Sequence, residues 1–335
     1  MKFVVFSDLH LNEWTYGSTL VDGKNSRLLA QADVLKQIRE YCVAEDIRSV
    51  FFCGDLFHTH SKVSAAVLHV AYEEFKAFEA ADIYVTFLVG NHDMSDRAGK
   101  VHTLDFLSLL GQVVRPNEGV IQDGGSKTGP AYYYYSYTED REALLNFLKF
   151  CDRPGYLFLH QGVRDVPMGS GFVIPNEILS AEDIPSNIIM AFTGHYHSHR
   201  RVSANLCIVG SPMQHDWGDT GEDRGWLLVD GKNVTLIPSK APCFLEISPE
   251  EAMSNPENMT GNYVRITTPD KDWLVDKEGL VKEGALSVEF TVTKETNNQE
   301  LINVDSFELE PLIKEFEKRN KVTKVLGDIG RELRS

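Results

Sequence analysis

Residues 83–93 of this chain read IYVTFLVGNHD. A run of apolar and β-branched residues ends directly in Gly90, and three polar side chains follow it: Asn91, His92 and Asp93. Such near-continuous apolar runs are typical of strands that are covered on both faces. The stretch therefore predicts a buried strand whose end carries chemically active side chains.

The same pattern recurs along the chain and defines the fold class. Further short apolar runs that end in polar, Gly or His residues lie at 3–6, 49–53, 156–159 and 188–193. Helical spacing of apolar residues appears at 25–45, 61–80 and 139–150, and strands without intervening helices follow at 132–137, 206–209, 226–229 and 234–237. We therefore expect an α/β fold, a two-sheet sandwich flanked by helices, over residues 1–240.

The pattern changes after residue 240. Strands are expected at 244–247, 263–267 and 287–293, which suggests a small α+β domain over residues 243–295. Residues 296–335 are expected to form a linker and an amphipathic C-terminal helical segment.

Composition excludes several classes of protein. The 335 residues are 42% hydrophobic with a net charge of −16, which fits a globular chain and argues against a large basic surface for nucleic acid. Five widely spaced cysteines without a CxxC pair are expected to be reduced thiols. Apolar runs are strand-sized and no signal peptide is visible, so we expect no membrane span and a cytoplasmic location.

Polar clusters at the ends of the predicted strands carry the chemistry. They supply two carboxylates, one amide and four imidazoles: Asp8, His10, Asp55, Asn91, His160, His195 and His197. Because polar groups this dense at the ends of core strands are costly unless something satisfies them, we interpret the set as metal ligands.

The mixture of donors indicates the kind of metal. With no thiolate among them, imidazole, carboxylate and amide oxygen suit Mn²⁺, Fe²⁺ or Zn²⁺, and Mg²⁺ is also compatible. Seven ligands exceed one open site and suit two divalent ions that share a carboxylate, as in two-metal phosphoester hydrolysis.

The ordered motifs DxH, GD, GNHD, H and GHxH resemble those of the calcineurin-like metallophosphoesterase superfamily over roughly residues 1–230. The resemblance implies that Asp8, His10, Asp55 and His197 hold one ion. It implies that Asp55, Asn91, His160 and His195 hold the other, with Asp55 as the bridge. By the same resemblance, His92 acts as general acid or transition-state stabiliser and Asp93 orients it.

Two further segments are similar to SbcD-type recombination nucleases, and the chain's length resembles their bacteriophage members. Gly54-Asp55 continues as Leu-Phe-His, where protein phosphatases of the superfamily carry GDxVDRG, and this adds His58 to the candidate catalytic residues. GlySerPro at 210–212 with ArgGly at 224–225 is the second segment. The resemblance makes residues 243–295 a capping domain and residues 296–335 a docking segment for an ATPase partner.

That resemblance implies a DNA exonuclease or endonuclease subunit acting in DNA repair and recombination, with Mn²⁺ as the expected metal. It implies an SbcC-like SMC-type ATPase as partner, a homodimer within a heterotetramer, and the host cytoplasm if the chain is phage-encoded. Two other readings stay open: a small-molecule phosphodiesterase or nucleotidase of the same superfamily, and a metal-bound scaffold without catalysis.

Other basic residues and histidines lie on or near the loops that carry these motifs. Candidate DNA contacts are Lys24, Arg27, Arg97 and Lys100, on loops next to the motifs. His60, His69, His102 and His199 fall outside the pattern and are expected to be ordinary polar residues.

Overall fold

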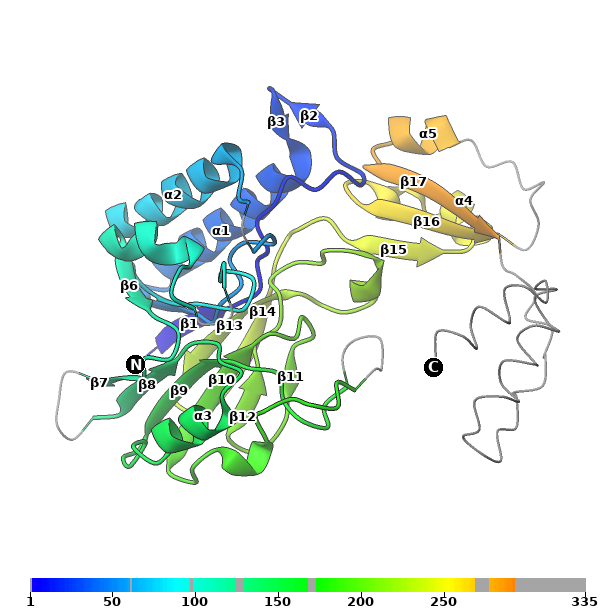
Figure 1. The fold of residues 1–335 in the computed structure, drawn as a ribbon. Helices are drawn as coiled ribbons and strands as arrows, with labels where there is room; N and C mark the ends of the chain where they lie inside the picture. Colours follow the sequence, from blue (N-terminus) through cyan, green and yellow to red (C-terminus); the bar gives the residue numbers. More distant parts are fainter. Residues whose placement is uncertain are drawn as a thin grey trace, which may run out of the picture. The chain divides into compact units, whose positions relative to one another are not determined.

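Two mixed six-stranded sheets lie face to face in the part of the chain that the structure describes (Figure 1). This computed structural model describes residues 2–60, 62–96, 99–124, 129–167, 173–268 and 277–292. The first sheet has the order β14-β13-β1-β4-β5-β6 and the second β11-β12-β10-β9-β8-β7. The predicted fold class is therefore confirmed.

The first sheet has a parallel half and an antiparallel edge. Its parallel strands are β1 (Lys2–Phe6), β4 (Ser49–Phe52), β5 (Tyr84–Leu88) and β6 (Gly111–Val114). The antiparallel edge consists of β13 (Gly225–Asp230) and β14 (Asn233–Pro238).

The second sheet is parallel through its centre. Its parallel strands are β8 (Ala131–Tyr135), β9 (Gly155–His160), β10 (Ile188–Gly194) and β12 (Leu206–Ile208). The antiparallel edges are β7 (Val120–Asp123) and β11 (Arg200–Arg201).

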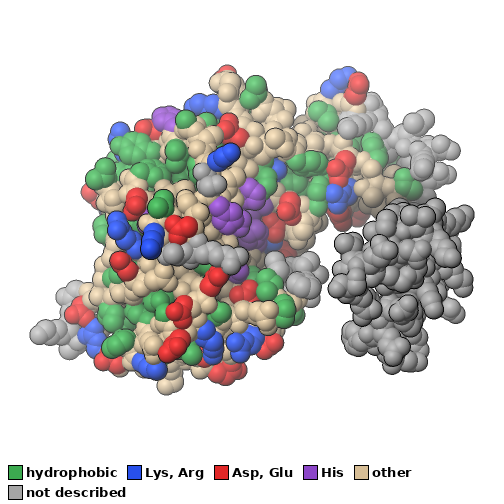
Figure 2. Space-filling model, in the orientation of Figure 1, with side chains coloured by type: hydrophobic (Ala, Val, Ile, Leu, Met, Phe, Trp, Pro, Cys, Tyr) green, Lys and Arg blue, Asp and Glu red, His purple; other side chains and the backbone are tan. Residues whose placement is uncertain are grey.

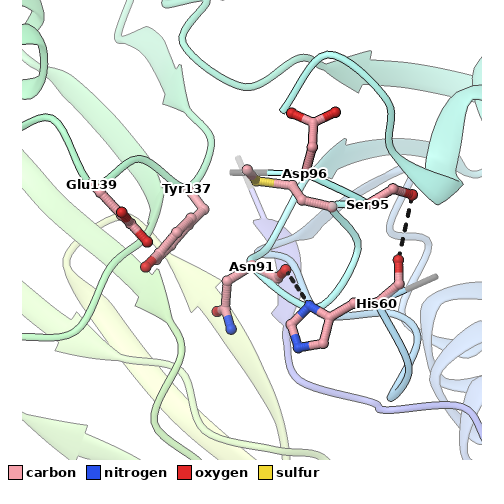
Figure 3. Close-up of a pocket in the computed structure, with 7 residues that line it drawn as sticks. His60, Asn91, Ser95, Asp96, Tyr137 and Glu139 are labelled. Carbon is pink, nitrogen blue, oxygen red and sulfur yellow. Dashed lines mark hydrogen bonds between the residues drawn. The ribbon is translucent and has the colours of Figure 1, made fainter. Parts of the chain in front are cut away.

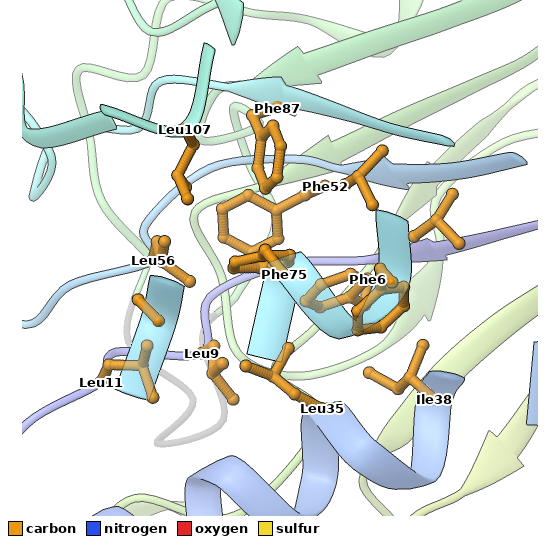
Figure 4. Packing of buried hydrophobic residues seen from close by; sticks show 14 of the residues in the cluster. Phe6, Leu9, Leu11, Leu35, Ile38, Phe52, Leu56, Phe75, Phe87 and Leu107 are labelled. Carbon is orange, nitrogen blue, oxygen red and sulfur yellow. The ribbon is translucent and has the colours of Figure 1, made fainter. Parts of the chain in front are cut away.

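The side chains of β1 point alternately to the two apolar layers on either side of the first sheet. Phe3 and Val5 pack between the two sheets, whereas Val4 and Phe6 pack beneath the helices on the outer face. Successive side chains of a strand point to opposite faces, so a strand covered on both sides must be apolar throughout. Figure 4 shows the outer layer, where Phe6 and Phe52 lie among side chains of the helices.

Three helices cover the outer faces, and each begins at a capping residue. Helix α1 (Ser26–Ala44) is capped by Asn25 and α2 (Ala65–Ala80) by Ser64, and both pack on the first sheet. Helix α3 (Arg141–Leu148) is capped by Asp140 and packs on the second sheet. The helix expected at 61–80 therefore begins later, at Ala65, because Ser64 has an extended backbone and caps the helix. Ser61 lies outside the described residues.

The segment predicted to form a small domain has the expected three strands. Strands β15 (Phe244–Ile247), β16 (Tyr263–Thr268) and β17 (Ser287–Val292) are parallel, with α4 (Pro249–Ser254) and α5 (Lys277–Lys282) beside them. Ala252, Met259, Val264 and Ile266 belong to its own apolar core. It belongs to the same compact unit, Met1–Val292, as the two large sheets. The predicted segment 296–335 lies outside the described residues.

Several short elements were not predicted. They are the hairpin strands β2 (Leu20–Val21) and β3 (Lys24–Asn25), the edge strands β6, β7 and β11, and the 3₁₀ helices η1 (Thr103–Leu109), η2 (Ala181–Asp183), η3 (Trp217–Asp219) and η4 (Pro256–Met259). Edge strands are half-exposed and lack the continuous apolar run that marks the central ones. In the described residues no helix combines the length and hydropathy that crossing a membrane requires.

Candidate metal centre

The predicted ligands meet at one edge of the sandwich. Asp8 and His10 follow β1, Asp55 follows β4, and Asn91 follows β5. The second sheet contributes His160, the last residue of β9, and His195 and His197 from the loop after β10. These strands run parallel within each sheet, so their carboxyl ends collect at one rim. Figure 2 shows histidine side chains gathered near the middle of this face.

Unusual backbone geometry aims these side chains. Asp8, His10, Asp55 and His195 have φ angles of 53°, 49°, 59° and 88°, in the left-handed region that non-glycine residues rarely adopt. Backbone bonds from Asp8 N to Gly54 O (2.9 Å) and from His10 N to Asp55 O (3.1 Å) hold two of the loops together. Such strain persists only where the surroundings enforce it, and functional sites are where it concentrates.

Gly54 is required for the close approach of the loops. Its φ of +96° favours glycine, and a Cβ atom there would collide with the imidazole of His160. In the GD motif, Asp55 is a candidate metal ligand, and Gly54 is the residue without a Cβ atom that lets His160 at the end of β9 come close.

The first group of donors is Asp8, His10 and His197, whose candidate ligand atoms lie within 4.8 Å of one another. His10 Nε2 and His197 Nε2 are 3.2 Å apart. Two facing imidazole nitrogens have lone pairs directed at the same space, which suits a shared proton or a cation.

The second group is Asp55, His160 and His195, again within 4.8 Å of one another. Asn91 joins it, because its Oδ1 lies 3.1 Å from His160 Nε2 and 2.9 Å from His195 Nδ1. Asp55 Oδ2 lies 3.3 Å from His160 Nε2 and 3.8 Å from His10 Nε2, so this carboxylate reaches both groups. The structure thus brings all seven residues together, and their assignment as ligands stays a prediction.

Burial and charge set the protonation of these groups. Burial lowers the pKa of His10 well below its ordinary value, which favours the neutral imidazole that metals bind. Burial alone would also lower the pKa of His160, but the Asp55 carboxylate raises it to about 9. Burial raises the pKa of Asp8.

The donor set fits two divalent ions. It combines buried carboxylates with imidazoles that have a lone pair to offer, and it contains no thiolate. His160 Nδ1 lies 2.5 Å from the carbonyl oxygen of Cys53, so this nitrogen carries the hydrogen and Nε2 is left for a metal.

His92 lies beside the donors, and its neighbours differ from those expected. Its Nδ1 is 2.7 Å from the carbonyl oxygen of His58, and its backbone N–H donates to Asp55 Oδ1 at 2.8 Å. The carboxylate of Asp93 instead accepts hydrogen bonds from the backbone N–H groups of Asp55, Leu56, Phe57 and Gly90. The expectation that Asp93 orients the His92 ring is therefore wrong, because both carboxylate oxygens hold the GD and GNHD loops. Burial, with the nearby Asp55 charge, raises the pKa of Asp93 to about 7.

His58 lies at the site as expected. Its ring centroid is 4.3 Å from that of Trp14 and 5.6 Å from that of His10. One ligand atom from each of His10, His58 and His92 also falls within 4.8 Å of the others.

Several residues near the site were missed or misjudged. His60 was expected to be an ordinary polar residue, but its ring stacks 4.4 Å from that of His92 and its Nδ1 lies 3.0 Å from Asn91 O. His215 is buried, with Nε2 2.9 Å from Asp8 O. Two histidines fit the expectation of ordinary polar residues: His69 is exposed on α2, and His199 Nδ1 donates to Ile208 O.

An ion pair supports the loop that carries His197. Arg224 contacts Asp219 at 2.9 Å and donates to the carbonyl oxygen of His197. Asp219 Oδ1 lies 3.8 Å from His197 Nδ1. Neither Asp219 nor His215 ends a strand, so no pattern in the sequence marked them.

The candidate DNA contacts have different outcomes. Lys24 and Lys100 are exposed, and Arg97 lies outside the described residues. Arg27 is only 3% exposed, donates to His215 O at 2.5 Å and lies over the ring of Trp14. Its guanidinium is therefore occupied inside the protein, and its proposed contact with DNA was wrong.

Comparisons with known proteins identify a family and several similar proteins. The sequence pattern of the family described as calcineurin-like phosphoesterase matches residues 1–208. A "DNA double-strand break repair protein Mre11" from Sulfolobus acidocaldarius is 25% identical over 63% of this chain and 54% of its own length. The D subunit of the nuclease SbcCD from Bacillus subtilis is 23% identical over 67% of this chain and 66% of its own length. The chain thus spans between about half and two thirds of these relatives. A solved dimetal phosphatase from Danio rerio aligns over 68% of this chain and 91% of its own, with 12% identity and a TM-score of 0.44.

Proposed function

This chain belongs to the calcineurin-like phosphoesterase family, and from that membership we propose that it is a DNA nuclease subunit. It hydrolyses phosphodiester bonds at a centre of two divalent ions, with Mn²⁺ as the activating metal. The observation that carries the proposal is the convergence of the two donor groups on Asp55, with His92 beside them.

Each residue has a defined task in this reaction. Two ions bound at such donors supply an acidified water and neutralise charge on the phosphate. Asp55 shares its carboxylate between the donor groups, and His160 and His195 approach from the second sheet. The hydrogen on His92 Nδ1 is held by the His58 carbonyl, which leaves Nε2 to pass a proton to the departing oxygen as the P–O bond breaks.

DNA is the favoured substrate for two reasons. The curated relatives are named as a DNA repair protein and a nuclease. The sequence after Asp55 also lacks the arginine with which phosphatases of the superfamily clamp a phosphomonoester.

The acidic balance of the chain supports a partner. A net charge of −16 gives weak attraction for DNA, so the subunit alone is expected to bind DNA weakly and to lose binding steeply with salt. The similarity to a component of the nuclease SbcCD suggests the kind of partner, an SMC-type ATPase that contributes basic surface. We propose residues 296–335 as its docking segment and a homodimer within a heterotetramer as the assembly.

The test is cleavage of end-labelled duplex and single-stranded DNA with Mn²⁺ or Mg²⁺, with and without a co-purified ATPase partner. Metal-dependent DNA cleavage is expected, and Asp55→Asn should remove it while the exposed Asp152→Asn does not. Efficient hydrolysis of cyclic nucleotides without DNA cleavage would contradict the proposal and favour a small-molecule phosphodiesterase.

A further inference from the structure

A cavity of about 370 Å³ opens beside the candidate metal centre (Figure 3). Asn91, one of the second donor group, forms part of its wall, so the cavity and the metal centre share a residue. Its volume falls within the range of about 300–1,000 Å³ that small-molecule sites occupy. A substrate with its phosphate at the donors can therefore extend a neighbouring group into this space.

Two aromatic side chains stand on different sides of the cavity. Tyr137 is tied to the end of β5 by the bond from its N–H to Val89 O (2.9 Å), and its ring stacks 5.9 Å from that of His195. His60 is held by its bond to Asn91 O and by stacking on His92. Figure 3 shows Tyr137 and His60 on opposite sides of Asn91. Flat rings fixed in this way offer stacking surfaces.

The negative charge at the cavity favours ligands that carry hydrogen-bond donors. Asp96 and Glu139 are exposed at its wall, and among the described residues no lysine or arginine lines it. Among the described residues, Asp96 Oδ1 accepts one long bond, 3.4 Å, from the backbone N–H of Lys100, and the carboxylate is exposed at the cavity wall. Carboxylates repel phosphate but accept hydrogen bonds from amino groups.

We propose that this cavity binds the unstacked nucleobase next to the scissile phosphate and prefers bases with an exocyclic amino group. The inference rests on the proposed function, since it assigns a base subsite to the same centre. Tyr137 supplies a stacking face, and Asp96 or Glu139 accepts from the amino group, as acidic side chains accept from the N4 amino group of cytosine. Cytosine, adenine and guanine satisfy this requirement, whereas thymine has no amino group.

The test uses mononucleotides as competitive inhibitors of bis-p-nitrophenyl phosphate hydrolysis by the full chain with Mn²⁺. Inhibition constants are measured for the 3′- and 5′-monophosphates of deoxycytidine and thymidine, with deoxyribose 5-phosphate as the reference without a base. We expect the deoxycytidine nucleotide to bind about fivefold more tightly than the thymidine nucleotide in at least one series. Removing both carboxylates, Asp96→Ala with Glu139→Ala, should bring that ratio to about one, and the exposed Glu73→Ala should leave it as in the wild type.

A second variant tests stacking. Tyr137→Ala should weaken both nucleotides by about tenfold relative to deoxyribose 5-phosphate, whereas Tyr137→Phe should not. Ratios within one variant cancel any effect on the metal centre. Equal inhibition by both nucleotides in the wild type, or an unchanged ratio in the double variant, overturns the base subsite. Because this readout uses no DNA cleavage, its failure is separate from failure of the nuclease assay.

Discussion

The Nδ1 atom of His92 lies 2.7 Å from the carbonyl oxygen of His58. A carbonyl oxygen only accepts, so Nδ1 carries the hydrogen and Nε2 is the nitrogen whose proton can be exchanged. The two residues belong to different loops, one after β4 and one after β5. The backbone of the GD loop thus fixes the hydrogen of this ring, as a carboxylate does for the histidine of a catalytic triad.

Replacement of His92 tests its role as a proton donor. His92→Asn should lower kcat about 10²–10⁴-fold, the usual contribution of a general acid, with unchanged metal content. Steady-state hydrolysis of bis-p-nitrophenyl phosphate and elemental analysis of the protein measure the two effects. The exposed His69→Asn is the matched control. A full rate in His92→Asn with Mn²⁺ would remove His92 from the mechanism.

Asp93 should prove structural. Its two oxygens accept four backbone N–H groups, and an Asp93→Ala change leaves these buried donors without an acceptor. We expect a loss of roughly 3 kcal/mol or more in the free energy of unfolding, together with weaker metal binding. Urea unfolding and metal titration measure both, with the exposed Asp152→Ala as control. A variant as stable as the wild type but slow in catalysis would restore the role first expected for Asp93.

The ion pair of Arg224 with Asp219 should stabilise the His197 loop. Their side chains are 4% and 9% exposed, so Arg224→Met takes the guanidinium away from a nearly buried carboxylate. We expect about 3 kcal/mol lower stability and weaker binding of one of two metal ions. Calorimetric metal titration and urea unfolding provide the readouts, and the exposed Arg48→Met, which loses a surface ion pair, is the control. Two metal ions bound with wild-type affinity would contradict the link from Arg224 to His197.

The candidate ligands at the strand ends could be predicted from sequence because a buried strand and the residue after it are local features. Asp8, Asp55 and Asn91 each follow such a run, and parallel strands carry them to one edge. Contacts between distant loops could not be predicted in this way. Asp93 accepts hydrogen bonds from a loop that lies more than thirty positions earlier. Arg27 is buried among aromatic side chains that include Phe244 of β15. His60 contacts Asn91 only in the folded chain.

Stability should depend on His102 below neutral pH. Burial lowers its pKa from the ordinary value of 6.5, so the unfolded chain binds the proton first as pH falls. The stability that the neutral ring provides is complete above pH 6.5 and is lost as pH falls from there through the lower pKa of the folded state. As the pH falls from about 7.5 to 5.5, the free energy of unfolding of the wild type should therefore decrease relative to that of His102→Gln. A difference that is constant across this range would contradict the assignment.

Two metal ions held by seven side chains around Asp55 can be located directly by anomalous diffraction. The crystals are grown with Mn²⁺, and data are recorded on both sides of the manganese absorption edge. Two peaks are expected, one bounded by Asp8, His10 and His197 and one by Asn91, His160 and His195, with Asp55 in contact with both. A single peak, or peaks away from these residues, would contradict it.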